Sequence, residues 1–451
     1  MKRIIFLFIF LIVDYALAET VTVKDYLELL LQSDVEYERI VKDLEKKNYV
    51  VNAGLPTKEF LLDVQNEYGI VLGDGQTTST LGTSLSKEFV QSGTRASAYF
   101  NKNKQIGRDE KTTGVRIEQP VLFNAFGSTS RLTKNKLTQE EEIIYLQVVQ
   151  AFEDYVEKKV QEYLDLQLDY VKLQAAYELE KQAKVLEKNI LEKNKSNIAR
   201  SLDVDRITLQ RLEAQESVLQ TQTSFEDKLR AIGQVIGRSL PPDVVITEVQ
   251  NFESDVQTIP SLVQSSRTLE IAKKQTLILK DQALLQKRGL VPELDLVLGF
   301  NRDESTRFNV SADRNEFVIG FDASLPLGDS QGKALLKTAS LEASIAQMDE
   351  MLLQRNIEIE LATLRSQIEK QRKSVDIAKE KSKLSERIAK EEIKRYNRGQ
   401  IDIEQLVDAQ YQRAQHQFAM IESSVTLSKL IFQWKNRTDQ LLKKEDIARL
   451  Q

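Results

Sequence analysis

Two long parts of the chain repeat their apolar positions with the period of a helix. From Val149 to Tyr177 the apolar residues recur about every 3.5 residues, which is the spacing of a coiled-coil seam. A second apolar stripe, from Leu164 to Ile190, runs beside the first, and residues 357–378 repeat the pattern. A helix with two adjacent stripes has neighbours on more than one side. The pattern therefore predicts long helices in a bundle or wall rather than an isolated dimer.

Glycine and proline are absent from these helical stretches. Neither residue occurs in Ser128–Ile232, in Lys333–Arg398 or from Gln400 to the end, and all three stretches are rich in strong helix formers. At 1.5 Å per residue, a helix from Ser128 to Asn194 would reach roughly 100 Å. Such a length has little use in a globular domain.

Between the helices lie four short segments whose apolar residues alternate with acidic or small polar ones. They are residues 59–72, 112–121, 293–303 and 315–325. The alternation is typical of a transmembrane barrel strand, with lipid on one face and water on the other, although a half-buried sheet on a soluble core shows it too. The mature chain has no run of 18 apolar residues, so any membrane span would have to be made of strands.

Residues 73–110 are rich in Gly, Ser and Thr, and their alternation is weak. We expect this region to form an additional extracellular hairpin. If its strands joined the barrel, the barrel would be wider than four strands per chain allow.

The order of elements repeats, which predicts an internal duplication. The first repeat, residues 19–245, holds a helix, the first strand pair and a helical hairpin at 128–237. The second repeat, residues 261–451, holds a helix, the second strand pair and a helical hairpin at 328–440. Residues 246–260 connect the two repeats.

The N-terminus has the pattern of a secretory signal peptide over residues 1–18. Lys2 and Arg3 precede an apolar run, Ile4–Val13, which is too short to cross ~30 Å of hydrocarbon, and Ala16 and Ala18 provide small residues for cleavage. The chain contains no cysteine, which fits a bacterial export route without disulfides.

Four strands cannot close a barrel in lipid, because an open sheet edge leaves backbone groups unpaired. Identical copies must therefore pair the edges. Three copies would supply about twelve strands, enough to enclose water, and would bring the helices into a closed ring.

The composition argues against an enzyme and against nucleic acid as a partner. The chain has 63 basic and 68 acidic residues and a net charge of −5, without a basic face. With no cysteine and a single histidine, His416, the usual ligands of zinc or copper are lacking, and no phosphate-binding loop is present. We therefore expect no cofactor and no catalytic residue, and energy for any transport must come from a partner protein.

The chain resembles the TolC-type outer-membrane efflux family over nearly its whole mature length. The resemblance is carried by the turns Gly54-Leu55-Pro56 and Gly289-Leu290-Val291-Pro292 before the strand pairs, by Gln119–Phe123 with Gly127, by Leu325–Gly328 and, most specifically, by Arg395–Ala409. It implies a trimeric α+β membrane protein, with a β-barrel of about four strands per protomer continued by a long α-helical coiled-coil barrel in the periplasm. It also implies a bacterial outer-membrane location and a passive exit duct in a tripartite efflux pump or a type I secretion system.

The resemblance also implies partners and site residues. A periplasmic adaptor would dock on the helical turns, and an inner-membrane pump or ABC exporter would drive transport. The expected docking residues are Asn197, Arg200, Ser201, Asn397, Arg398 and Gly399. The expected periplasmic constriction contains Tyr396, Asp402, Glu404 and Asp408.

The constriction departs from the family's pattern at two positions. Tyr396 and Asp408 match a tyrosine and an aspartate of the family's gate, whereas Ile401 and Gln405 stand where arginine and a second aspartate are expected. Three copies of Asp408 on an axis would form an acidic ring that favours cations.

Simpler interpretations of the same residues stay open. Asp408 fits a solvated helix face equally well, and Tyr396 fits a packing residue before a left-handed cap at Gly399. Two other functions are a periplasmic membrane-fusion adaptor, which would show one helical hairpin instead of two, and an envelope coiled-coil scaffold without a pore.

Overall fold

The structure is a computed structural model. It describes residues 20–55, 59–70, 77–105, 108–242, 244–247, 259–307, 310–325 and 328–442. The predicted signal peptide, Pro56 and Pro326 lie outside these residues.

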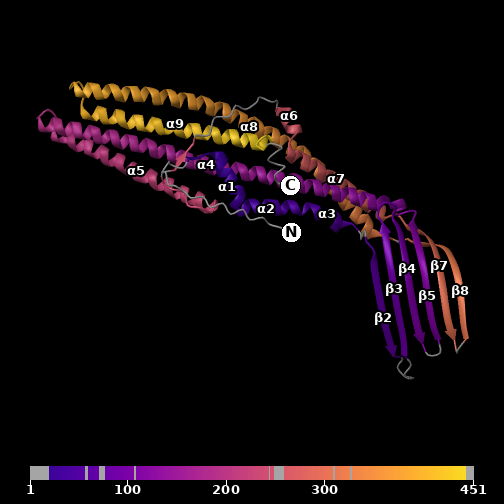
Figure 1. Cartoon of the computed structure of the whole chain (residues 1–451). Helices are drawn as coiled ribbons and strands as arrows, with labels where there is room; N and C mark the ends of the chain where they lie inside the picture. Colours follow the sequence, from indigo (N-terminus) through magenta and orange to yellow (C-terminus); the bar gives the residue numbers. More distant parts are fainter. Residues whose placement is uncertain are drawn as a thin grey trace.

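The molecule is long, with helices running side by side and a sheet that leaves one end of them at an angle (Figure 1). The helices are α1 (Val23–Ser33), α2 (Val35–Glu45), α3 (Lys47–Gly54), α4 (Ser128–Lys195), α5 (Ser201–Val235), α6 (Ile259–Gln264), α7 (Arg267–Gly289), α8 (Ser330–Asn397) and α9 (Ile403–Arg437). The strands are β1 (Thr20–Val21), β2 (Leu61–Ile70), β3 (Thr77–Phe89), β4 (Thr94–Gln105), β5 (Arg108–Pro120), β6 (Val245–Ile246), β7 (Glu293–Arg307) and β8 (Val310–Ser324).

The four long helices form two pairs of equal dimensions. Helices α4 and α8 both have 68 residues, and α5 and α9 both have 35. Each pair is joined by a short turn, and both turns lie at the end of the molecule that is far from the sheet (Figure 1). Since the lengths agree, the two turns come to the same level.

The predicted seam of α4 is buried from Val149 to Leu173, with Tyr163 wholly enclosed. Its members pack against α1, α2, α5 and α9, so α4 is surrounded as its two stripes predicted. The seam ends at Tyr177, which is exposed. Helix α8 buries Ile357, Leu361 and Leu364 against α9 and the short helix α6.

The six longer strands form one antiparallel sheet in the order β2-β3-β4-β5-β7-β8. The four segments with clear alternation lie in β2, β5, β7 and β8. The expectation of about four strands per chain is too low for this sheet, because residues 77–105 add β3 and β4 inside it. Their alternation is weak because Ser and Thr, which suit either face, occupy many of their positions.

The two faces of the sheet differ in chemistry. On one face Phe317, Ile319 and Phe321 are about 70% exposed, at 66%, 72% and 70%. The other face carries ion pairs, such as Arg116 Nη2 with Asp322 Oδ2 at 2.6 Å. Beside the exposed apolar residues, the alternate positions of β8 are partly covered, as expected if the sheet curves toward its polar face.

No helix among the described residues combines the length and the apolar character that crossing a bilayer demands.

A largely buried ion cluster joins α4 to the start of α7 and to the segment that follows α9. Arg267, at the start of α7, places Nη1 2.8 Å from Glu153 Oε2 of α4 and 3.3 Å from Asp439 Oδ1, just after α9. The Arg267 backbone N–H also donates to Asp439 Oδ2 at 2.7 Å. Burial raises the pKa of both the Glu153 and the Asp439 carboxyl groups. One guanidinium therefore compensates the fully buried Glu153 carboxylate and the largely buried Asp439 carboxylate.

We predict that Arg267→Ala lowers the free energy of unfolding by about 3–5 kcal/mol near neutral pH, because two buried carboxylates lose their counter-charge. Their folded-state pKa values then rise further above the unfolded ones. The penalty is largest where the carboxyl groups of the unfolded chain are ionised, and it fades as the pH falls from about 5 to about 3, where the unfolded chain becomes protonated as well. Thermal unfolding in detergent near neutral pH and at about pH 3 measures the loss.

The matched control is Arg437→Ala, which removes an ion pair with Glu360 that is nearly half exposed on both sides. It should cost less than about 1 kcal/mol at either pH. Equal losses for the two variants would contradict a structural role for the Arg267 cluster.

Candidate functional site at the helical tips

The first turn reverses the chain between α4 and α5 within five residues. Asn197 adopts a left-handed conformation with φ 56°, and the Ile198 N–H donates back to Lys193 O at 2.8 Å. The Asn194 side chain donates to Ala199 O at 2.8 Å, and the Asp203 carboxylate accepts from the Arg200 N–H at 3.1 Å, which caps α5. The turn is thus closed by its own backbone and cap groups.

The second turn has the same geometry. Gly399 is left-handed with φ 71°, and the Gln400 N–H donates to Arg395 O at 2.9 Å. Asp402 then occupies the N-cap position of α9, as Arg200 does for α5. Gly399 and Asn197 are equivalent, and asparagine is the residue that most readily replaces glycine in this conformation. A glycine search misses the first turn for this reason.

Charged side chains connect the two turns. Arg200 Nη2 lies 3.9 Å from Asp402 Oδ1, and Arg206 Nη1 lies 3.0 Å from Glu404 Oε2. In both pairs the arginine belongs to the first tip and the acid to the second. The first tip, the turn between α4 and α5, thus supplies arginines to the second tip, the turn between α8 and α9. In the second tip Ile401 stands where the family's pattern has an arginine.

Lys193 and Tyr396 form a third connection. Lys193 Nζ lies 4.6 Å from the centre of the Tyr396 ring and donates to Asn397 Oδ1 at 2.9 Å. Burial lowers the pKa of the Lys193 ammonium, while burial and the nearby Asp203 raise the pKa of the Tyr396 phenol. Tyr396 is therefore a packing residue and also a cation–π partner across the two tips.

A small apolar cluster lies directly beneath these polar contacts. Its buried members are Ile190 of α4, Ile207 of α5, and Ile403 and Leu406 of α9. Helix α8 contributes Ile393, which packs against the cluster from its edge. It holds the two tips side by side in the single chain.

The expected constriction residues separate into two groups. Tyr396, Asp402 and Glu404 take part in the contacts between the tips. Asp408 lies farther along α9, is exposed, and has no hydrogen-bond or ion-pair partner within the described part of the chain. Lys193 and Arg206 were missed, because the sequence does not show which charges of the first turn lie beside those of the second.

The expected docking residues all lie on the outer surface of the turns. Asn197, Arg200, Ser201, Asn397, Arg398 and Gly399 are exposed. They form a mixed basic and amide surface at the far end of the molecule (Figure 1).

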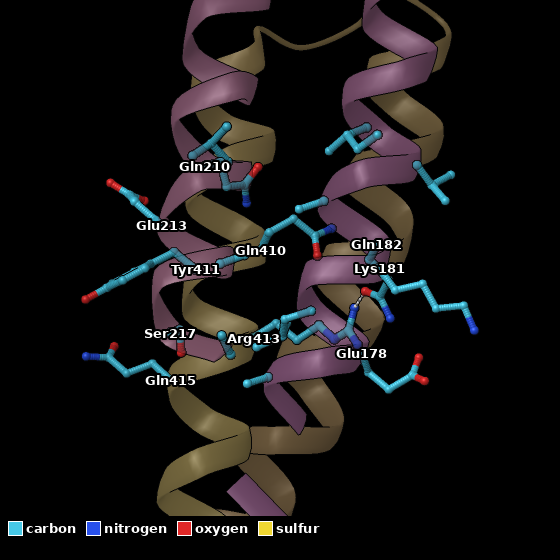
Figure 2. A pocket seen from close by; sticks show the side chains of 18 of the residues that line it. Glu178, Lys181, Gln182, Gln210, Glu213, Ser217, Gln410, Tyr411, Arg413 and Gln415 are labelled. Carbon is cyan, nitrogen blue, oxygen red and sulfur yellow. Dashed lines mark hydrogen bonds between the residues drawn. The ribbon is translucent and has the colours of Figure 1, made fainter. Parts of the chain in front are cut away.

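Behind the tips, a cavity of about 1010 Å³ separates the two helix pairs, and Asp408 is among its lining residues. Figure 2 shows Arg413 of α9 reaching Gln182 of α4 across this gap, where the two side chains form a hydrogen bond. Gln410 is buried beside them, and its side-chain amide nitrogen has no partner in the described part of the chain. Here the helix pairs are bridged by polar side chains rather than by a continuous apolar core.

No family model matches the chain, and no curated protein matches its sequence. Several solved structures match its fold, and three of them illustrate the likeness. The outer-membrane protein VceC of Vibrio cholerae has a TM-score of 0.70 and 12% identity, covering 92% of this chain and 95% of its own. The open-state outer-membrane channel MtrE of Neisseria gonorrhoeae has a TM-score of 0.70 and 14% identity, covering 93% and 89%.

The third structure is CusC, described for its folding and transmembrane channel formation, with a TM-score of 0.71, 11% identity, and coverage of 92% of this chain and 91% of that one. These likenesses confirm the expected resemblance at the level of the fold. The chain has the fold of outer-membrane channels along nearly its whole length.

We predict that Gly399→Ala destabilises the second tip by about 1–2 kcal/mol. A Cβ at Gly399 would meet no atom within 4 Å, so the cost comes only from the left-handed backbone. Hydrogen exchange of residues 395–406 should become faster by roughly five- to thirty-fold. The control is Gly289→Ala, which is equally uncrowded but has no positive φ. Faster exchange around residue 289 in the control would contradict the explanation.

Proposed function

We propose that this chain is an outer-membrane channel subunit, a passive exit duct in an efflux pump or a type I secretion system. The observation that carries the proposal is the sheet, which exposes an apolar face and opposes it with an ion-paired face. A single chain in water would expose that apolar face at high cost. Lipid against the apolar face and a water-filled lumen against the ion-paired face would give each face of the sheet a suitable environment.

The oligomer follows from the sheet edges. Strands β2 and β8 each have one unpaired side in the described sheet, and they run in opposite directions. The β8 edge of one copy can therefore pair antiparallel with the β2 edge of the next. We propose three copies, as in the sequence analysis, because four long helices per chain then give a ring of twelve around a wide tunnel.

We also propose that the chain arose by internal duplication, and the equal spacing of its helices supports this. The helices of the second pair begin and end the same number of residues after their counterparts in the first pair. The correspondence extends to the C-terminal caps, where Gly237 with φ 72° and Asp439 with φ 55° occupy equivalent left-handed positions. A duplicated unit would place two similar helix pairs per copy around the tunnel wall.

The two alternative functions fit the molecule less well. A membrane-fusion adaptor would not need two equal helical hairpins on one six-stranded sheet. A scaffold without a pore gives no reason for Phe317, Ile319 and Phe321 to stay exposed. In our proposal the exposed turns at the tips are the surface for a periplasmic adaptor, and an inner-membrane pump or exporter supplies the energy.

We further propose that the contacts between the tips hold the periplasmic end closed. The arginines lie on α5 or its cap and the acids on α9 or its cap, so the second helix pair is tied to the first at Arg200–Asp402 and Arg206–Glu404. Separating the pairs would require breaking these exposed contacts and the small cluster beneath them. Asp408 would then line the opening and favour cations.

The channel is tested by planar-bilayer recording of the purified protein, with two neighbouring substitutions. Ile319→Arg places a charge on the apolar face and should cost about 2–4 kcal/mol at the bilayer centre, reducing inserted channels strongly. Val318→Arg faces the polar side and should insert normally. A protein that never conducts, or that tolerates both substitutions equally, contradicts the proposal.

The closing contacts are tested by charge reversal. An exposed pair is worth about 0.2–1 kcal/mol, and three copies acting together make Arg206→Glu raise the open population by about three-fold to a hundred-fold. Glu404→Arg should do the same, and the double reversal should restore the wild-type current.

The control for this series is Arg230→Glu, on the same helix α5 but in an exposed pair with Asp227 away from the tips. It should leave the current unchanged. If the double variant conducts as much as either single variant, the pair does not close the channel.

A further inference from the structure

We infer that the β3–β4 hairpin is part of the membrane wall, so that three copies close a barrel of eighteen strands instead of twelve. This inference rests on the proposed function and adds the width of its conduit. It concerns residues 77–105, which the sequence analysis placed in an extracellular hairpin.

The hairpin is paired along its whole length. Strand β3 pairs with β2 from Thr77 to Ser86 and with β4 from Ser79 to Phe89. Strand β4 pairs with β5 from Arg95 to Gln105. An excursion above the membrane would leave β2 and β5 as direct neighbours, whereas here the hairpin separates them completely.

The turn between β3 and β4, residues 90–93, lies where the helices begin and is held there by hydrogen bonds. Arg131 of α4 donates to Gln91 O at 2.6 Å, and the Gln119 amide donates to Ser92 O at 3.1 Å. The turn approaches Gly127 so closely that a Cβ there would lie 2.4 Å from Gln91 O. The hairpin therefore starts at the same level as the other strands.

A side chain on the polar face also ties β4 to its neighbours. The Tyr99 hydroxyl donates to Asn301 of β7, crossing over Gly114 of the intervening strand β5. A Cβ at Gly114 would lie 2.7 Å from the Tyr99 ring, so only glycine accommodates this arrangement. An aromatic residue that covers a strand glycine is a device that fixes sheet register.

The apolar band crosses the sheet as it would in a tilted barrel. The register aligns Ile319, Leu298, Ile117, Ala96 and Lys87 in one row. On β8 the apolar residues are centred near this row. On β5, β4, β3 and β2 their centre lies progressively farther from the helices.

From β8 to β2 the centre of the apolar band moves by about six residues, which is about 20 Å along the strands. The five strand pairs span about 24 Å across the sheet, so the strands are tilted by roughly 40° relative to the normal of the band. Closed barrels have tilts of about 35–45°. Without β3 and β4, nearly the same shift would fall on three strand pairs and make the tilt too steep. The band is continuous only if the hairpin lies in the membrane.

The width of the sheet also matches the helices attached to it. Helices α3, α4, α7 and α8 pack in that order and connect to the strands. Three gaps between helix axes span about 24–30 Å. At a 40° tilt, six strands span about 31 Å and four strands about 19 Å. Six strands therefore continue the helical wall without narrowing it.

The proposed barrel is wide, and the part that β3 and β4 add has a different lining from the rest of the lumen. Its backbone diameter would be about 36 Å, against about 24 Å for twelve strands at the same tilt. The polar face of β3 and β4 carries mostly neutral hydroxyl and amide groups, including Ser84, Ser97, Asn101 and Asn103. Such a lumen would not be the narrowest part of the duct.

The hairpin is tested by spin labelling, which the absence of native cysteine makes simple. Single cysteines at each position from 95 to 100 in β4, and from 317 to 321 in β8, are labelled in the full-length protein in lipid vesicles. Accessibility to oxygen and to a water-soluble nickel chelate is measured. We expect labels at Ala96, Ala98 and Phe100 to favour oxygen and those at Arg95, Ser97 and Tyr99 to favour nickel.

The β8 series separates the two possible failures. If β8 alternates but β4 reports water at every position, the hairpin lies outside the membrane and this inference is wrong. If β8 also reports only water, the proposed membrane channel itself is wrong.

End-on cryo-electron microscopy averages of the detergent-solubilised protein give a second, label-free measurement. We expect eighteen strands in the barrel cross-section. Twelve strands with separate density outside the ring would overturn the inference even if the labelled variants failed to fold.

Discussion

The unpaired edges of a sheet that has one apolar face are the constraint on which the rest of this structure depends. Backbone groups cannot remain unpaired in hydrocarbon, and an apolar face cannot remain bare in water. Strands β2 and β8 both present open edges, at opposite ends of a sheet whose apolar residues are among the most exposed in the molecule. Closure by further copies satisfies both requirements together. An even number of strands per chain makes that closure antiparallel.

In the proposed assembly, the helical half of the molecule extends the same closure away from the lipid. Helices α3, α4, α7 and α8 connect to the strands, so whatever ring the sheet forms is imposed on the helices. The equal lengths of α4 and α8 and of α5 and α9 then bring both turns to one level. The tips can contact each other only because neither helix pair is longer than the other. The geometry of the tip site is thus set by repeat length as much as by its own side chains.

The sequence predicted those features that a periodic pattern records, and missed those that depend on tolerant residues. The long helices and the buried α4 seam were evident because apolar residues recur over many turns. Strands β3 and β4 were not assigned to the sheet, because serine and threonine satisfy either face and blur the alternation. Asn197 was assigned to the first turn, but its equivalence to Gly399 becomes visible only in its left-handed backbone conformation.

The candidate site shows the same limit. Tyr396, Asp402 and Glu404 were selected from one segment, and the structure does bring them into the contacts between the tips. Their partners Lys193, Arg200 and Arg206 lie about 200 residues earlier, and only the packing of two helix pairs places them within reach. Arg200 had been assigned to docking alone. Sequence reasoning finds charges of opposite sign but not which of them meet.

The Arg267 cluster and the ion pairs between the tips differ in burial, and therefore in how much they stabilise the contacts that they make. Away from the tips, Arg267 bridges the fully buried Glu153 and the largely buried Asp439, and breaking that cluster is costly. At the tips, Arg206 and Glu404 are well exposed, so water replaces their contact at little cost. The cavity behind the tips interrupts the side-chain packing that would otherwise hold the helix pairs together. In the proposed duct, the weakly joined tips can separate while the Arg267 cluster and the sheet stay intact, which is what opening at one end requires.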